Sequence, residues 1–326
     1  MAQGLLGSIT KYNRIAQITF AERLAENTAV FNANSGACLT LGTEVVPGMG
    51  ATDTYWARSS TAGAARRDIT STSSITKIAD SNAAEKKAKQ FCKYTPYAMS
   101  ISAIHNTADA VGNAQREEDY IRARSVQLAD DAARLMANVA LSAVYGAIQN
   151  TTANINDQSA STITSNMLQD TLQKVGDQQG MLSHVMMHSA VRSKLVTTSI
   201  SANRYDDVAP VLNGADPATL GRMQVITDNT NMSAGSPAVY RTYFMKPQSV
   251  IVNMRETVPL FWEVDELTEN ISLFSGGEFE VQVAVPGYTY AGTDNPTDAT
   301  LATQASWTQK AVQDSAIGIT LLKSLA

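Results

Sequence analysis

The longest regular pattern in the sequence is helical and runs from about residue 114 to residue 149. Ile121, Leu128 and Leu135 recur every seven residues, which places them on one face of an α-helix, and Gly112 interrupts the chain just before the pattern. At ~1.5 Å per residue, a helix of this size reaches about 50 Å. Typical helices have only about 11–12 residues. We therefore predict a spine helix at 114–149, around which the rest of the chain must fold.

The chain before this helix has two parts, neither of which is predicted to build a core of its own. Residues 1–35 favour a helix, but Phe20 and Leu24 are scattered among polar and small residues, so we predict a weakly cored arm. Residues 36–93 are rich in Gly, Ser, Thr and Ala, and 59–74 is almost entirely small or polar. Such a stretch cannot offset its own ordering entropy. We predict an extended loop that must lie on something else.

After the spine the pattern changes to short alternating elements with turn residues between them. We predict two helices, at 166–176 and 190–196, and six strands, at 183–187, 223–226, 239–244, 250–254, 279–285 and 317–322. Helices and strands are thus mixed over the second half of the chain. No internal repeat is visible.

The composition describes a chain that folds but carries few charges. Hydrophobic residues make up 44% of the sequence and charged residues 17%, against about a quarter in ordinary soluble domains. Disorder requires the opposite balance. Few charges are therefore present to keep copies of the chain apart, as suits a subunit that covers much of its surface with neighbours.

The net charge of −5 argues against binding through phosphate neutralisation, which requires an excess of Lys and Arg. The charge is uneven, however. The window 58–93 holds eight basic and three acidic residues, a local net charge of +5. Its basic residues are Arg58, Arg66, Arg67, Lys77, Lys86, Lys87, Lys89 and Lys93.

Histidine is the usual metal ligand and general base, and the chain has only three: His105, His184 and His188. His184 and His188 are four residues apart, but the HVMMH segment lacks the glutamate of the metalloprotease motif and reads as a strand entering a helix. A triad of Ser189, His188 and Asp177 lacks the G-x-S-x-G elbow. We predict neither a catalytic residue nor a metal site here.

Three other features have ordinary structural explanations. No phosphate-binding glycine loop is present. The acidic residues Glu263, Asp265, Glu266 and Glu269 do not have the spacing of a calcium loop, so a solvated acidic face is the better interpretation. Two cysteines are too few for a disulfide framework in a chain of 326 residues, and we predict free thiols. We expect no cofactor and no enzymatic activity.

The sequence has no predicted membrane segment. Its most apolar stretch, 135–148, is interrupted by Asn138 and Ser142 and is too short to span a bilayer. The first ten residues lack the basic and apolar regions of a signal peptide. We expect the chain to fold in a cytosol.

Three features of the sequence point to one known family. The first is Gly176-Asp177 followed by VMMHSAV at 185–191 and Leu195, a strand and a short helix joined by a Met-His-Ser turn. The second is LGRMQVITD at 220–228, a loop, Gly-Arg, a strand and Asp. The third is the order of elements: arm, polar loop, long helix, mixed sheet, late strand. In these features the chain resembles the major capsid proteins of tailed bacteriophages with the Hong Kong 97-type fold.

The resemblance implies an α+β fold in which a peripheral domain contains the spine helix and an axial domain contains a mixed sheet. The implied division is 1–35 N-terminal arm, 36–93 extended loop, 94–154 and 287–326 peripheral domain, and 155–286 axial domain. Arm and loop would pack on neighbouring subunits. In this interpretation the chain is a structural subunit that self-assembles through pentamers and hexamers into an icosahedral head, forming in the host cytoplasm and ending in the virion.

The implied partners follow from the same resemblance. The head would enclose double-stranded DNA without sequence-specific contact and would carry a portal, while the use of a decoration protein stays open. Some relatives begin with a long acidic scaffolding segment that is cleaved off. No such segment precedes the arm here, so a separate scaffolding protein is implied and N-terminal cleavage is not expected. No Lys–Asn pair suited to covalent cross-linking is evident.

We call the basic window 58–93 of the extended loop the basic loop. The resemblance places it across a neighbouring subunit, on the outer side of the shell. We therefore predict intersubunit contacts with acidic surface for Arg58, Arg66, Arg67, Lys77, Lys86, Lys87 and Lys89. Packaged DNA and a merely solvated hairpin are the alternatives for these residues. Two other functions stay open at this point: the shell of an encapsulin-like compartment with enzyme cargo, and a soluble α/β enzyme.

Overall fold

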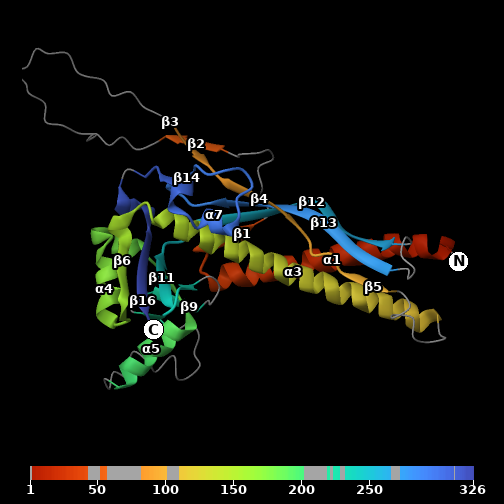
Figure 1. The fold of residues 1–326 in the computed structure, drawn as a ribbon, viewed down its shortest axis with the longest axis horizontal. Coiled ribbons are helices and arrows are strands. Elements are labelled where there is room, and N and C mark those ends of the chain that lie inside the picture. The colour runs from red at the N-terminus through yellow and green to blue at the C-terminus, as the bar shows by residue number, and fades with distance from the viewer. Residues whose placement is uncertain are drawn as a thin grey trace, which may run out of the picture.

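The computed structural model describes residues 2–42, 52–56, 82–100, 110–201, 219–220, 223–227, 232–265, 272–311 and 313–326. Two long helices, α1 (Ala2–Asn34) and α3 (Ala110–Ile148), lie side by side along the long axis and run in the same direction (Figure 1). The predicted spine at 114–149 is confirmed as α3. Ile121 and Leu128 on this helix are fully buried, whereas Leu135 is only partly buried.

A small residue lets the end of the spine make a close crossing. Gly146 lies against the short helix α7 (Asp298–Leu301), where an added Cβ would stand 2.0 Å from the carbonyl oxygen of Leu301. Trp307 closes the same corner by donating its indole N–H to that carbonyl at 2.8 Å. Only glycine fits this position on α3.

The first large sheet has five strands and lies along the two long helices (Figure 1). Its path is β1 (Leu39–Gly42), β12 (Val250–Asp265), β13 (Ser272–Ala284) and β4 (Ala88–Lys93), and β5 (Ala98–Ser100) also pairs with β13. The pairing of β1 with β12 is parallel and the others are antiparallel. Both ends of the predicted loop are therefore strands of this sheet.

Strands β12 and β13 form a hairpin much longer than the predicted strands at 250–254 and 279–285. Pro259 and the Gly276–Gly277 pair lie at irregularities where β12 carries extra residues. Gly277 has φ 140°, and a Cβ on it would come within 2.8 Å of the Tyr94 ring. The proline and glycines thus mark β-bulges within a continuous hairpin.

The second large sheet has seven strands and occupies the wide end of the molecule (Figure 1). Its path is β6 (Ile155–Thr162), β16 (Ile319–Leu325), β11 (Val239–Met245), β7 (His184–Met187), β9 (Met223–Thr227) and β8 (Thr219–Leu220), and β10 (Ser233–Ala234) pairs with β11. The β6–β16 and β7–β9 pairs are parallel and the rest antiparallel, so the predicted mixed sheet is confirmed. Helices α4 (Ser165–Gln173) and α5 (Ser189–Ser201) lie at this end.

The two sheets group the chain differently from the predicted domain boundaries. Residues 250–284, assigned to the axial domain, form the first sheet and pack on the spine. Residues 319–325, assigned to the peripheral domain, are an inner strand of the second sheet. The physical reason lies in the residues of β16: Ile319 through Leu322 are all buried, as a strand covered on both faces requires.

Shorter elements complete the described chain. Strands β2 (Thr52–Trp56) and β3 (Asn82–Lys86) form an antiparallel pair, consistent with the two stems of an extended loop. Strands β14 (Tyr288–Tyr290) and β15 (Trp307–Gln309) form another. The 3₁₀ turns are η1 (Thr152–Asn154), η2 (Gly176–Met181), η4 (Gln304–Ser306) and η5 (Asp314–Ile317).

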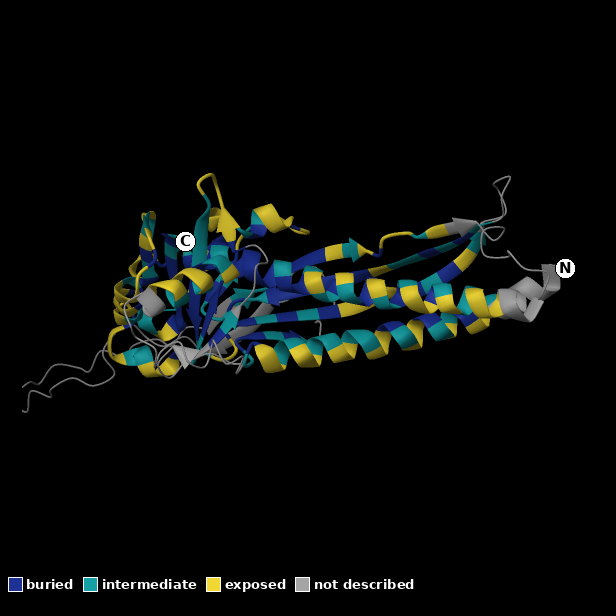
Figure 2. Cartoon of the chain, turned by 90° about the horizontal axis from the view of Figure 1, so that it is seen from below, coloured by how far each residue is buried: buried dark blue, intermediate teal, exposed yellow. Residues whose placement is uncertain are grey.

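Helix α1 packs on the body of its own chain, so the prediction that the arm lacks an intramolecular core was wrong. Tyr12, Ala16 and Phe20 are buried with α3 and the first sheet in the main core, and Phe20 stacks edge-on against Tyr94 at 5.2 Å. These residues are four apart and therefore share one helix face. Figure 2 shows exposed residues along the outer sides of both long helices and buried residues where they meet the sheets. In the described part of the chain, no helix is both long and apolar enough to cross a bilayer.

Candidate intersubunit surface

The predicted contact residue Lys89 lies inside the subunit. It is 6% exposed on β4, and its Nζ stands 2.6 Å from Oε2 of Glu280 on β13, which is 4% exposed. Both charges are thus removed from water and neutralise each other within one chain. The prediction that Lys89 contacts a neighbour conflicts with this burial. Its partner was not predicted, because sequence spacing does not place residues 89 and 280 on adjacent strands.

Lys86 lies at the end of β3, on the stem of the extended loop. Its Nζ is 3.1 Å from Oδ1 of Asp294, and both side chains are partly exposed. Its backbone N–H donates to Oγ1 of Thr289 at 2.8 Å. The stem is therefore fixed to the segment that follows β13. Among the other predicted contact residues, Lys87 lies between β3 and β4. Arg58, Arg66, Arg67 and Lys77 lie outside the described residues.

Each described histidine has a structural explanation. His184 Nδ1 is 2.6 Å from the Ser183 hydroxyl, and its ring fills the space beside Gly36, where an added Cβ would meet Nε2 at 1.8 Å. His188 Nδ1 accepts a hydrogen bond from the backbone N–H of Ala190 at 3.0 Å, at the start of α5. Its ring packs on Tyr240 at 4.8 Å. The Met-His-Ser turn thus begins a helix, while His105 lies outside the described residues.

Possible metal and nucleophile sites can be checked only over the residues that the structure describes. Within them, no three His, Cys, Asp or Glu side chains gather as metal ligands. Glu263 is exposed on β12, and Glu266 and Glu269 lie outside the described residues. Cys38 and Cys92 are free thiols, and burial raises the pKa of Cys38 to about 12 and that of Cys92 to about 11. A nucleophilic cysteine requires the opposite shift.

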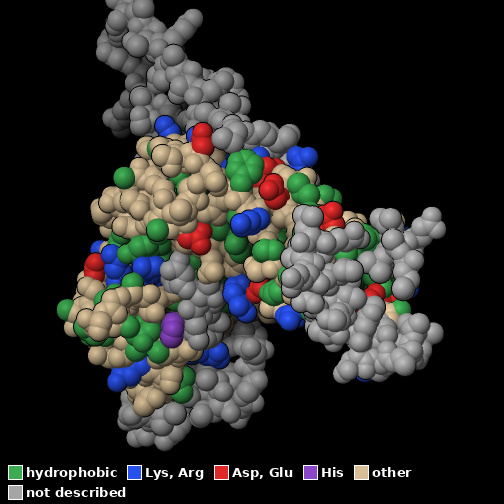
Figure 3. Space-filling model, turned by 45° about the vertical axis from the view of Figure 1, so that its right-hand side comes forward, with side chains coloured by type: hydrophobic (Ala, Val, Ile, Leu, Met, Phe, Trp, Pro, Cys, Tyr) green, Lys and Arg blue, Asp and Glu red, His purple; other side chains and the backbone are tan. Residues whose placement is uncertain are grey.

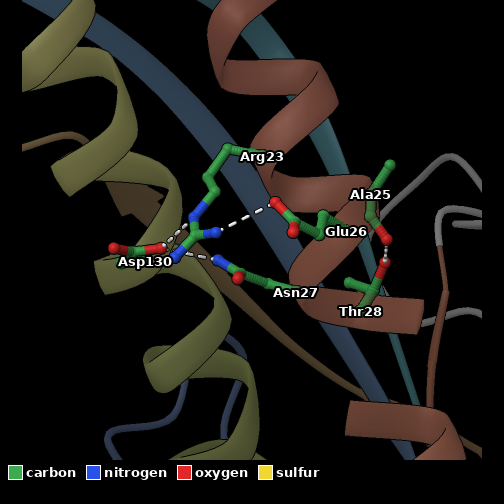
Figure 4. A network of polar contacts seen from close by, with 6 residues as sticks. All are labelled: Arg23, Ala25, Glu26, Asn27, Thr28 and Asp130. Carbon is green, nitrogen blue, oxygen red and sulfur yellow. Dashed lines mark hydrogen bonds and ion pairs between the residues drawn. The ribbon is translucent and has the colours of Figure 1, made fainter. Parts of the chain in front are cut away.

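A polar network joins α1 to α3 where the two helices run together (Figure 4). Arg23 Nε donates to Asp130 Oδ1 at 2.8 Å, and Asn27 Nδ2 donates to the same oxygen at 2.7 Å. Burial by itself raises the pKa of Asp130, but the hydrogen bonds from Asn27 and Arg23 have the larger combined effect, so the pKa of Asp130 is lowered. Arg23 also pairs with Glu26 at 2.9 Å. Asp130 is therefore held as a carboxylate between the helices.

This network borders a groove of about 560 Å³ between α1 and α3. Its apolar lining includes Phe31 and Ala137 from the helices and Met186 and Ile226 from the second sheet. Val30 also lines the groove and is 53% exposed, the largest exposed fraction among the described large apolar side chains. The sequence does not predict this groove, because the groove depends on how two helices far apart in the chain pack together.

The described surface shows no built catalytic centre. On the face drawn in Figure 3, Lys and Arg side chains alternate with Asp and Glu, and hydrophobic side chains lie between them. An interspersed surface of this kind suits repeated contacts with other protein subunits better than the concentrated, single-sign charge of a nucleic-acid groove.

Solved structures with the same fold are phage capsids. The capsid of Ralstonia phage GP4 aligns with a TM-score of 0.52 at 10% identity, covering 90% of this chain and 88% of that chain. Microbacterium phage Oxtober96 gives 0.52 at 10% identity, covering 89% and 90%. The Cyanophage Pam1 capsid gives 0.51 at 12% identity, covering 88% of each chain. No curated protein matches the sequence of this chain.

The fold is an α+β fold shared with phage capsid structures, and it is consistent with the predicted Hong Kong 97 type. The family model described as "Gp13-like: Major capsid protein 13-like" matches residues 8–317, and the chain belongs to this family. It is therefore a major capsid protein of a tailed phage, a structural subunit that assembles with its own copies into a shell and forms part of the virion. Its function is structural and not enzymatic.

Proposed function

We propose that this chain forms the pentamers and hexamers of an icosahedral head that encloses double-stranded DNA without sequence-specific contact. The family match over residues 8–317 is the main support. The net charge of −5 agrees with DNA that is enclosed and not wrapped, since wrapping requires the protein to neutralise phosphates. Assembly would take place in the host cytoplasm before the head becomes part of the virion.

The experiment is to purify particles from producing cells and treat them with nuclease before extraction. We expect protected double-stranded DNA inside the filled particles. Particles that hold a protein cargo and no DNA would contradict the proposal and favour a protein compartment. Mass spectrometry of the same particles tests the proposed portal, scaffolding and decoration proteins.

The two sheets support a revised division into domains. We assign the spine α3, the helix α1 and the five-stranded sheet to the peripheral domain, because they share the main core. We assign the seven-stranded sheet with α4 and α5 to the axial domain, because its outer side has a separate core that includes Ile163, Leu168 and Phe244. In this division β16 belongs to the axial domain, and the β12–β13 hairpin to the peripheral domain.

We further propose that the basic loop binds acidic surface on the adjacent subunit through Arg58, Arg66, Arg67, Lys77, Lys86 and Lys87. Charge supports this pairing: the window 58–93 carries +5, whereas residues 151–326 hold ten basic and seventeen acidic residues. Lys86 already pairs with Asp294 within its own subunit, so it would add to this contact only through the exposed part of its side chain. An exposed pair contributes only ~0–1 kcal/mol, but a shell repeats it in every subunit.

The double variant Arg66→Glu with Arg67→Glu tests this contact. Shell melting, measured by calorimetry at two ionic strengths, should shift to lower temperature, most strongly at low salt where screening is weak. The control Arg66→Lys with Arg67→Lys keeps the charge and should melt like the wild type. Equal melting temperatures for all three proteins would show that these charges do not contribute to the stability of the shell. A defect confined to DNA-filled particles would place the loop on the inner surface.

A further inference from the structure

The described strands pair with the outer edge of β12 over only part of its length. β13 pairs with one edge along nearly the whole strand, whereas β1 pairs with the other edge only from Val250 to Asn253. Among the described strands, none pairs with this outer edge between Met254 and Asp265. An open edge presents backbone N–H and C=O groups to which another chain can add a strand. This edge therefore needs a cover.

Side chains of α1 supply that cover. Asn13 Oδ1 accepts a hydrogen bond from the backbone N–H of Trp262 at 2.6 Å. Gln17 Nε2 donates to the carbonyl oxygen of Leu260 at 3.1 Å. Asn13 and Gln17 are four residues apart and so share one face of the helix. Two backbone groups of the β12 edge thus find their partners in a helix instead of a strand.

The direction of these bonds agrees with the sheet. Trp262 lies opposite Ser275 on β13, and Ser275 donates its backbone N–H to Tyr97 on the far side from β12. The backbones of Trp262 and Ser275 therefore do not hydrogen-bond to each other. Each residue directs its N–H and C=O groups away from the other strand. Because backbone directions alternate along a strand, Val264 points the same way as Trp262. Leu260 lies in the bulge between Val258 and Phe261, and the hydrogen bond from Gln17 shows that its carbonyl oxygen also points outward.

Helix α1 is attached to the body by a narrow apolar face and by polar contacts near the surface. Tyr12, Ala16 and Phe20 are its buried hydrophobic residues among those whose side chains are described. The Arg23–Asp130 pair leaves its side chains 37% and 39% exposed, and exposed pairs add little stability. Uncovering the edge therefore means releasing this apolar face from the main core together with these polar contacts.

The uncovered edge is complementary to itself. Leu260 and Trp262 point into the core, whereas Phe261 is half-buried and Glu263 is exposed on the opposite face. Two copies in antiparallel register centred on Trp262 place Trp262 opposite Trp262, and Leu260 opposite Val264. All of these residues direct their backbone groups outward, as a hydrogen-bonded antiparallel pair requires. Glu263 then faces Phe261, so no like charges oppose each other.

We propose that α1 guards the outer edge of β12, and that this edge, once uncovered, pairs with the same edge of a second copy in antiparallel register centred on Trp262. We assign a second copy as the partner because this register pairs the backbone groups of both edges and brings no like charges together. The pairing is separate from the loop contacts proposed above and does not rest on them.

Hydrogen exchange tests whether α1 protects the outer edge of β12. The double variant Asn13→Ala with Gln17→Ala removes both side-chain partners, and the amides of residues 260–264 should then exchange several-fold faster than in the wild type. The control Arg14→Ala with Glu22→Ala changes two exposed residues of α1, leaves the net charge unchanged and should exchange like the wild type. Equal exchange at 260–264 in all three proteins would overturn the proposal.

Cross-linking tests the partner and the register. In the Asn13→Ala, Gln17→Ala background, copies carrying Phe261→Cys are mixed with copies carrying Glu263→Cys and oxidised. The proposed register brings these positions to about 4.5 Å between Cα atoms, within reach of a disulfide. Mass spectrometry should find the 261–263 link in clear excess over the 263–263 link. Faster exchange without this excess would overturn pairing with a second copy.

Discussion

At the scale of single residues, the buried pair of Lys89 and Glu280 shows where sequence reasoning stops. The run of lysines was visible, and the family resemblance placed it on the outer side of the shell. Strand β4, however, pairs with β13 so that Lys89 lies opposite Gln282 and beside Glu280, and there the two charges are buried. Pairing of residues almost two hundred positions apart decides the environment of Lys89. A local pattern contains no signal for it.

Lys89→Met should leave the Glu280 carboxylate buried without its cation. Breaking one side of a buried pair costs about 3–5 kcal/mol in the free energy of unfolding. Lys89→Met together with Glu280→Met removes both charges and should recover most of that loss, since paired replacement by apolar residues is nearly neutral. Urea unfolding of the unassembled subunit measures both. A double variant no more stable than the single one would show that the pair is not the cause.

The cysteines make a second prediction at this scale. Because burial raises the pKa of Cys92 to about 11, its thiolate fraction at pH 8 is on the order of 10⁻³. Reaction with a disulfide reagent such as DTNB should be on the order of a hundredfold slower than for a free thiol, and slower still for Cys38. The rate should rise about tenfold per pH unit and become fast in urea. Rapid labelling of the native protein at pH 8 would contradict this.

At the scale of elements, strongly periodic or apolar segments were predicted well and polar or interrupted ones poorly. The spine, α4 and the strands β7, β9 and β11 were predicted close to their observed bounds, whereas α5 was predicted to end at residue 196 and continues to Ser201. Strand β6 (INDQSAST) was missed because nothing in it alternates; it is positioned by parallel pairing with β16. The Asn156 side chain contributes by donating to the Thr171 hydroxyl at 3.0 Å.

The spine offers a graded test of its packing face. Leu128 is 2% exposed, so Leu128→Asp buries a charge in the main core and should cost at least about 3 kcal/mol, enough to make the protein insoluble. Leu135 is only partly buried, and Leu135→Asp should cost less. Soluble yield and thermal unfolding distinguish the two variants. A Leu135→Asp protein less stable than Leu128→Asp would show that the helix face is assigned incorrectly.

At the scale of the whole molecule, the order of elements identified the fold, but the allocation of strands to sheets did not follow from it. The late strand β16 was expected beside the spine and lies instead between β6 and β11. Likewise the arm was expected to depend on a neighbour and packs on its own chain. Short-range patterns carry no information about which distant partner a segment meets. The predicted fold is therefore confirmed, whereas the predicted contacts of Arg58, Arg66, Arg67 and Lys77 stay a prediction.

Electron microscopy of the purified protein, expressed alone and together with a scaffolding protein, tests the central claim most directly. The low charge content and the capsid fold predict that the subunit associates into closed shells or tubes, resolvable into pentamers and hexamers. Light scattering on the same samples should report particles far larger than one subunit. A monodisperse monomer at high concentration, both with and without the scaffold, would contradict the account.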